Sequence, residues 1–475
     1  MGQVPIGEVE INPKSKNALE QMLVSLQEIF RNEEYNEKVF LLLEELLDGK
    51  DKRNGRPGMD LWVLFVLAQV RQCMNYSYET LHHQANNDYI LRRVMGVEQE
   101  WGFGRTEFEY QNIYDNVTLL DTEKLTRLND IIVAFGHGEV FKKKEGEELQ
   151  LKNDSFVVES NVHFPTDYNL LWDCIRKCLD IIKALLDRHP DIGGWRKIYW
   201  WRRELKSLAR ELGKASGSGG KNKEERVRTA TAKYLDKAIL LSFKIRELLH
   251  DFPLEEMVDA GLCMSLEYYA GLLDKHIGLL DRRVMKGEQI PHHEKMFSIF
   301  ESYTEWIVKG KSRPSVELGK KVAITTDQWG LVVDMEIMKH EQDRDVIIRI
   351  ADRLLSKYRV ASLSVDKGYW DAENRELLKL YIKDVVMPKL GRLSEKDKEL
   401  EESAMFKRLN RKHSAVESNI NELEHRGLDR CPDKGEGHFD RYVAASVCAY
   451  NLKKIGAAIL RARLEAEKKE IRKAS

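Results

Sequence analysis

The chain has 475 residues, of which 42% are hydrophobic and 33% are charged, a composition typical of a helix-rich globular protein with two or three domains. Its net charge of −1 neither favours nor excludes a nucleic-acid partner, so DNA binding would have to come from local basic patches. Apolar runs such as residues 61–70 are too short to cross a membrane, and residues 1–10 lack the basic and then apolar order of a signal peptide. We therefore expect a cytoplasmic protein with reduced cysteines and no membrane partner.

Residues 17–135 are predicted to be helical. Leu61, Leu64, Phe65 and Ala68 recur at helical spacing directly after the turn signal at residues 55–58. This pattern indicates a compact helical module. Its role stays open between a DNA-binding head and a packing or dimerisation domain.

A short strand and a long helical region follow. The β-branched and aromatic residues of 155–158 predict a strand. Residues 170–293 have a helical pattern, interrupted by a Gly/Ser cluster at 217–220 that is typical of a flexible loop.

After residue 300, strands and helices alternate. The predicted strands are 321–327, 331–337, 360–365 and 384–388, and the predicted helices are 345–358, 371–381, 394–424 and 441–475. This alternation predicts a mixed α/β domain whose first strand is separated from the others by a large helical insertion.

A basic and aromatic segment lies inside the helical region. Residues 196–223 contain nine basic and two acidic side chains, a local charge of 9 − 2 = +7, which favours contact with phosphates. Trp200 and Trp201 are candidates for stacking on an unpaired base, and the alternative is that both pack inside the helical core. The predicted DNA-binding residues of this segment are Arg196, Lys197, Trp200, Trp201, Arg202, Arg203, Lys206 and Arg210.

Several carboxylates could bind metal ions. Asp366 follows a predicted buried strand, a position from which carboxylates can point into a site, although it could instead cap the next turn. Glu417 lies at the edge of an apolar helical stripe and could equally be a solvated acid. Asp154 precedes the strand at 155–158, and its competitors are the nearby acids Glu159, Asp167 and Asp173. Residue types alone leave this choice open.

Four ordered segments resemble the DDE transposases of bacterial and archaeal insertion sequences (the ISNCY-like group). Residues 154–173, DSFVVESNVHFPTDYNLLWD, are similar to the block around the first catalytic aspartate of that family. Residues 305–311 and 316–319 resemble the block that precedes the next strands, and residues 365–374, VDKGYWDAEN, resemble the second-aspartate block. Residues 413–430 resemble the helix with the third carboxylate, and the 55–58 region resembles the N-terminal helical domain.

The resemblance implies a mixed α/β fold with an RNase H-like catalytic core, interrupted by an all-helical insertion and preceded by an all-helical domain. The implied organisation is an N-terminal DNA-binding or dimerisation domain at 1–140, a catalytic domain at 141–168 and 300–460, a helical insertion at 169–299 and a charged tail at 461–475. It also implies a metal-dependent transposase, in which Asp154, Asp366 and Glu417 are the catalytic residues and metal ligands. Two Mg²⁺ ions, replaceable by Mn²⁺, are the implied cofactors. The implied partners are the terminal repeats, target DNA and a second copy of the chain, with the protein on the nucleoid when DNA is bound.

The chain departs from the family pattern around Glu417. Related transposases often have Tyr and Arg seven and four residues before the glutamate and Lys seven after it, where this chain has Asn410, His413 and Glu424. The basic residues that could replace them as phosphate ligands are Lys407, Arg408, Arg411 and Lys412. Two alternatives therefore stay open: an RNase H-like nuclease or resolvase without strand transfer, and a catalytically inactive DNA-binding protein derived from a transposase.

Overall fold

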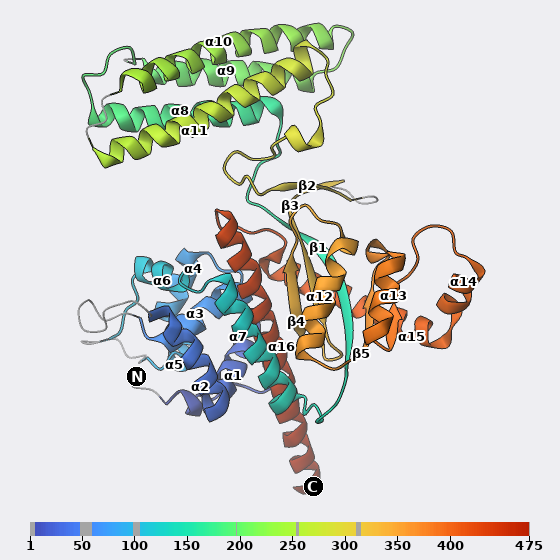
Figure 1. Ribbon diagram of the computed structural model, residues 1–475. Coiled ribbons are helices and arrows are strands. Elements are labelled where there is room, and N and C mark those ends of the chain that lie inside the picture. Colours follow the sequence, from blue (N-terminus) through green and yellow to red (C-terminus); the bar gives the residue numbers. More distant parts are fainter. Residues whose placement is uncertain are drawn as a thin grey trace. The chain divides into compact units, whose positions relative to one another are not determined.

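The computed structural model describes residues 5–47, 59–97, 105–195, 197–252, 256–309 and 315–474. The turn signal at 55–58, Arg196 and part of the 305–311 block lie outside these residues. The chain forms two compact units, one from residues 1–161 and 307–475 and the other from residues 162–306. The fold is mixed α/β, as predicted (Figure 1).

The sheet of the first unit is built around β1 (Leu149–Glu159). β1 pairs antiparallel with β3 (Val316–Thr326) and parallel with β5 (Val360–Val365). β4 (Val332–Ile337) is antiparallel to β3, and β6 (Asp384–Val386) is parallel to β5. With β2 (Glu305–Val308) beside β3, the sheet has six strands in the order β2-β3-β1-β5-β6, and β4 also pairs with β3. The predicted separation of the first strand from the others by a helical region is confirmed.

Four helices lie between or after the last strands of this unit. They are α12 (Asp343–Lys357), α13 (Ala372–Tyr381), α14 (Glu395–Glu402) and α15 (Ala404–Leu423). The predicted single helix at 394–424 is in fact α14 and α15. The break falls at Ser403, whose hydroxyl accepts a hydrogen bond from the backbone N–H of Phe406 and so caps the start of α15.

The N-terminal helices pack against one another, and some of them pack directly on a long C-terminal helix, α16 (Glu436–Ala474). These helices are α1 (Ala18–Arg31), α2 (Glu33–Glu44), α3 (Leu61–Cys73), α4 (Tyr78–Asn87), α5 (Tyr89–Val94), α6 (Tyr110–Val117) and α7 (Thr122–Phe135). α1 approaches α16 so closely that a Cβ at Gly456 would lie 1.6 Å from the carbonyl oxygen of Gln21. Only glycine fits at this contact.

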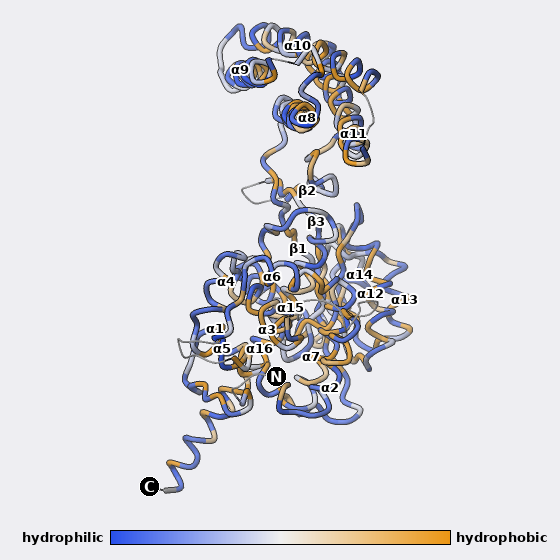
Figure 2. The backbone as a smooth tube through the Cα atoms, turned by 90° about the vertical axis from the view of Figure 1, so that its left-hand side faces the viewer, coloured by the Kyte–Doolittle hydropathy of each residue, from blue (hydrophilic) through white to orange (hydrophobic). Residues whose placement is uncertain are grey.

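The N-terminal helices and the sheet share one hydrophobic core, which includes Phe65, Val133, Val346, Leu363 and Leu452. The prediction of a separate domain at 1–140 therefore differs from the compact units, because α16 joins its helices to the sheet. The described part of the predicted tail at 461–475, residues 461–474, continues α16 as helix, and hydrophilic and hydrophobic residues alternate along this end (Figure 2). Within the described residues, α16 alone is long and apolar enough to cross a membrane, but 72% of its apolar window is buried, as in a core helix.

The second unit contains four long helices, at the predicted insertion. They are α8 (Asp167–Arg188), α9 (Ile198–Gly217), α10 (Lys223–Asp251) and α11 (Met257–Leu280). Their apolar faces form a core of their own, with Ile175, Leu205, Leu241 and Leu273 fully buried. The predicted Gly/Ser loop at 217–220 lies between α9 and α10.

Candidate active site

Asp154 and Asp366 occupy neighbouring positions on two parallel strands. In the β1–β5 register, Asn153 lies opposite Val365, so each aspartate is the next residue after a paired position. Parallel strands lie about 4.8 Å apart, and equivalent side chains of adjacent strands point to the same face. The register therefore puts these two acids side by side, although 212 residues separate them in the sequence.

α15 covers the same face of the sheet. The His413 Nδ1 lies 3.2 Å from the Ser364 Oγ, and the Lys412 Nζ donates to the Gln150 Oε1 at 3.2 Å. Ser364 precedes Asp366 by two residues and so shares its face of β5. Glu417 lies one helical turn after His413, at the exposed edge of a stripe in which Val416 and Ile420 are buried. The three predicted residues therefore belong to one region of the sheet.

The electrostatics of Asp154 agree with this arrangement. Burial raises its pKa to about 7, and the carboxylates of Asp366, Glu417 and Asp343 act in the same direction. The backbone N–H of Ser155 opposes the shift by donating to Asp154 at 2.7 Å. Neither Asp154, Asp366 nor Glu417 forms an ion pair with a residue that the structure describes. Within the described ranges, the charges of these three carboxylates are therefore not balanced by an ion pair.

The pKa of His413, on α15, is affected by two of the same carboxylates. Burial lowers its pKa, while the carboxylates of Asp366 and Glu417 oppose that shift. Its side chain is 7% exposed, and its Nε2 has no hydrogen-bond partner among the described residues. The imidazole therefore fixes α15 against β5 through Ser364 and leaves one nitrogen without a partner.

The donor chemistry of this region suits a divalent cation. Carboxylate oxygens are the ligands that Mg²⁺ and Mn²⁺ prefer, and a cation would oppose the burial and the neighbouring negative charges that raise the pKa of Asp154. The side chains are not gathered at ligand distance, however. Throughout the described ranges, no group of three His, Cys, Asp or Glu side chains is close enough to hold a metal ion. The three acids fit a metal by chemistry and position, and coordination would require their side chains to move together.

The acids that compete with Asp154 lie elsewhere. Asp167 and Asp173 belong to the helical unit, where Asp167 pairs with Arg283 and Asp173 accepts from the His163 Nε2 at 2.6 Å. Glu159 is five residues further along β1, where burial raises its pKa and the nearby Glu317 carboxylate adds to the shift. Position and register thus favour Asp154 over its competitors.

Glu424, seven residues after Glu417, is affected by some of the same charges as Glu159. Burial raises its pKa, the Lys309 ammonium opposes the shift, and the Glu317 and Asp429 carboxylates add to it. None of the three predicted acids is among the charges that act on Glu424.

Sequence reasoning missed Asp343, a fourth acid next to the site. It is the first residue of α12, its Oδ1 accepts from the Ser155 Oγ at 2.6 Å, and its Oδ2 accepts from the Lys321 Nζ at 2.9 Å. An acidic residue in the first helical turn is a recognisable signal in the sequence. The expected helix start at Asp345 hid it, and no sequence pattern shows that this turn faces β1.

The predicted DNA-binding residues differ in exposure. Lys197, directly before α9, and Trp200, Arg203, Lys206 and Arg210 on α9 are exposed. On α15 the exposed residues are Lys407, Arg408, Arg411 and Lys412.

The stacking prediction for Trp201 is wrong. Trp201 is 7% exposed and packs in the core of the helical unit, as the alternative interpretation expected, whereas Trp200 is 40% exposed. The Lys237 Nζ lies 4.2 Å from the ring centre of Trp200 and 4.6 Å from that of Trp201. Arg202 is half-buried and paired with Asp180. These contacts leave Trp200 as the one tryptophan of the pair that can meet a base.

Comparisons with known proteins returned no match to a family model, a curated protein or a solved structure. Function is therefore inferred from the geometry of the carboxylates and from the motif resemblance.

A pH-dependent loss of stability is expected from Asp154 in the absence of metal. Its pKa of about 7 exceeds the roughly 3.9 of an unfolded aspartate, so the folded state binds the proton more tightly. Stability should therefore fall as the pH rises from about 4 to 7, and Asp154→Asn should remove this loss and melt higher than the wild type at pH 8. Thermal melting in EDTA at pH 5 and pH 8 measures the effect. Asp352→Asn, at an exposed position of α12, is the control, and melting curves of Asp154→Asn that shift in parallel with the wild type would contradict the account.

Proposed function

We propose that this chain is a DDE transposase, which cleaves DNA at the ends of an insertion sequence and joins those ends to target DNA. The observation that carries the proposal is the convergence of Asp154 and Asp366 on neighbouring parallel strands under the helix that bears Glu417. The resemblance of the surrounding motifs supports the same assignment, and the strand order with its helical insertion agrees with an RNase H-like core.

Asp154, Asp366 and Glu417 would hold two Mg²⁺ ions, or Mn²⁺ in their place. Bound there, such ions would activate a water or a DNA 3′-OH and stabilise the leaving oxygen of an in-line displacement at phosphorus. Asp154 is oriented for this role by the backbone N–H of Ser155, and α15 is held over β5 by the His413–Ser364 contact. One site would then serve both cleavage and joining.

The protein surface next to the carboxylates supports a DNA substrate. Lys407, Arg408 and Arg411 are exposed on α15 and form no ion pair with a described residue. They replace the missing Tyr, Arg and Lys of the family pattern as phosphate ligands in our proposal. A second basic surface, on α9, carries Lys197, Arg203, Lys206 and Arg210 and would bind the same DNA or its target. Two ends have to be brought together, so we propose a homodimer that acts on the nucleoid.

Joining of a DNA end distinguishes this function from its alternatives. The substrate is a duplex that carries the DNA bordering the coding sequence and ends in a free 3′-OH, incubated with a supercoiled plasmid and Mg²⁺. A transposase is expected to attach the duplex covalently to the plasmid. Cleavage without joining would instead identify a nuclease or resolvase, and DNA binding without either reaction would identify a catalytically inactive derivative.

A further inference from the structure

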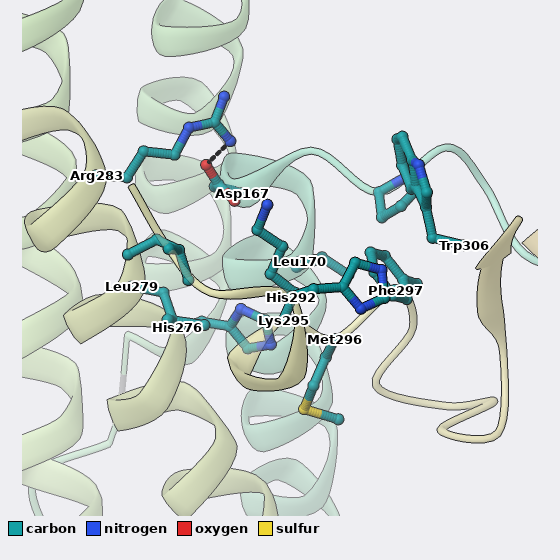
Figure 3. Close-up of a pocket in the computed structure, with 12 residues that line it drawn as sticks. Asp167, Leu170, His276, Leu279, Arg283, His292, Lys295, Met296, Phe297 and Trp306 are labelled. Carbon is teal, nitrogen blue, oxygen red and sulfur yellow. Dashed lines mark hydrogen bonds and ion pairs between the residues drawn. The ribbon is translucent and has the colours of Figure 1, made fainter. Parts of the chain in front are cut away.

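The helical unit contains a pocket that has no part in the proposed chemistry. It has a volume of about 240 Å³ and lies between α8, α11 and the segment that leads to Trp306 (Figure 3). Such a volume is below the roughly 300–1,000 Å³ of pockets for drug-sized ligands, so this pocket can enclose only part of a ligand of that size.

One side of this pocket is positively charged. Arg283 and Lys295 line it, and the one acid of the lining, Asp167, is already paired with Arg283. Lys295 forms no ion pair with any residue in the described ranges. The charge balance therefore favours an anionic group on the ligand.

The opposite side is aromatic. The Phe297 and Trp306 rings lie 5.4 Å apart between centroids, and Phe297 is also 5.4 Å from the His292 ring. Figure 3 shows Phe297 and Trp306 on the side away from the Asp167–Arg283 pair. Flat aromatic faces of this kind bind the π-face of any nucleobase.

A buried histidine adds an unused polar group to the lining. His276 is 3% exposed, and its Nε2 has no hydrogen-bond partner among the described residues. Burial lowers its pKa to about 4, with the Lys275 charge acting in the same direction, so the imidazole is neutral at physiological pH. A neutral imidazole has one donor and one acceptor nitrogen and suits the polar edge of a base.

We propose that this pocket binds a single nucleotide, with its base against Phe297 and Trp306 and its phosphate at Arg283 and Lys295. A lone inorganic anion would leave the aromatic side unused, and a purely apolar ligand would leave the charges of Arg283 and Lys295 unused. The nucleotide could be free in solution or be an unpaired nucleotide at a DNA end. The inference does not depend on the proposed transposase activity.

Calorimetric titration of the full chain tests the proposal, with deoxyadenosine 5′-monophosphate as the probe and deoxyadenosine and inorganic phosphate as comparisons. The monophosphate is expected to bind more tightly than either comparison. Lys295→Glu should lower the affinity for the monophosphate by at least about tenfold and leave the affinity for deoxyadenosine unchanged, because it removes only the phosphate contact. His276→Leu should weaken the binding of both, and Lys14→Glu, the same charge change at an exposed position of the first unit, should weaken the binding of neither.

A tailed duplex separates the two sources of the nucleotide. A DNA end is identified as the ligand by three results together. A duplex with one unpaired nucleotide binds more tightly than a blunt duplex, Lys295→Glu removes that preference, and the free monophosphate does not bind. Binding of the free monophosphate identifies a soluble nucleotide. The proposal is overturned if neither probe depends on Lys295, or if inorganic phosphate binds as tightly as the monophosphate.

Discussion

Asp366→Asn is expected to lower Mg²⁺-dependent DNA cleavage by about 10⁴-fold while DNA binding stays unchanged, because members of one catalytic unit cannot replace each other. Asp366 is exposed at the end of β5 and forms no ion pair with a described residue, so the substitution removes a negative charge and disturbs no protein contact. Amide oxygens are poorer ligands for Mg²⁺ than carboxylates. Nicking of a supercoiled plasmid that carries the bordering DNA measures the rate, and a gel-shift assay measures binding.

Asp352→Asn is a matched control for that experiment. Asp352 is also an exposed acid of the first unit, on α12 and outside the site, so its substitution should leave cleavage at the wild-type rate. Wild-type cleavage by Asp366→Asn would exclude Asp366 as a metal ligand. Equal losses in both variants would show that cleavage depends on overall charge and not on this carboxylate.

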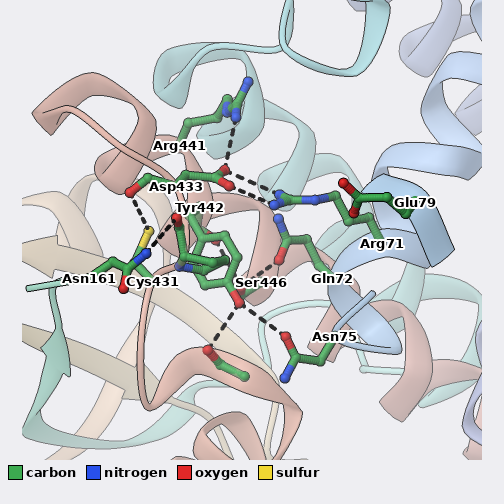
Figure 4. A network of polar contacts seen from close by, with 12 residues as sticks. Arg71, Gln72, Asn75, Glu79, Asn161, Cys431, Asp433, Arg441, Tyr442 and Ser446 are labelled. Carbon is green, nitrogen blue, oxygen red and sulfur yellow. Dashed lines mark hydrogen bonds and ion pairs between the residues drawn. The ribbon is translucent and has the colours of Figure 1, made fainter. Parts of the chain in front are cut away.

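Asp433→Asn is expected to lower the free energy of unfolding by about 3–5 kcal/mol, the usual cost of breaking a buried ion pair from one side. Asp433 lies between two arginines, accepting from the Arg71 Nη2 at 2.6 Å and from the Arg441 Nη2 at 3.0 Å (Figure 4). Arg71 is 4% exposed and lies 4.2 Å from the ring centre of Tyr78. Without the carboxylate, two cations would stay in a poorly solvated place.

This network joins α3 to the loop before α16 and so links the N-terminal helices to the rest of the first unit. Urea unfolding followed by circular dichroism measures the loss. Asp429→Asn, four residues earlier and exposed, should change the free energy of unfolding by less than about 0.5 kcal/mol. A loss below about 1 kcal/mol in Asp433→Asn would mean that the two arginines find other partners or reach water.

The sequence predicted most strands and helices because their apolar periods are strong, but it underestimated β1. Only residues 155–158 were recognised, whereas the strand runs from Leu149 to Glu159. Its first half contains the buried polar residues Lys152 and Asn153, which bond the Asp327 carbonyl and the Thr325 hydroxyl. Polar residues that bond distant partners have no apolar signal, so no local pattern could reveal them.

The organisation of the first unit also depends on distant contacts. The spacing of apolar residues in α16 predicts a helix, but it does not predict that α1 and α7 pack on this helix. Nor does it predict that Asn451 of α16 forms hydrogen bonds with the backbone of Val332 in β4. The sequence therefore suggested two domains, one for the N-terminal helices and one for the sheet, where the structure has a single hydrophobic core. The helical unit was easier to place, because its helices bury their apolar faces mainly against each other.

The candidate site could be predicted from the sequence only in part. Residue types left Asp154, Asp366 and Glu417 as open choices, and only the order of the family-like motifs selected them. The β1–β5 register and the position of α15 bring them into one region, which spacings of 212 and 51 residues could not reveal. The contributions of Asp343 and His413 depend on how α12 and α15 pack on the sheet, and no motif records this.

Anomalous diffraction from crystals of the wild-type protein soaked in Mn²⁺ tests the central claim most directly. We predict manganese bound between the Asp154 and Asp366 carboxylates, with Glu417 turned toward it, and loss of this peak in Asp366→Asn crystals. Manganese bound instead among Glu159, Glu317 and Glu424, or no bound manganese at a concentration that supports DNA cleavage, would contradict the assignment of the site.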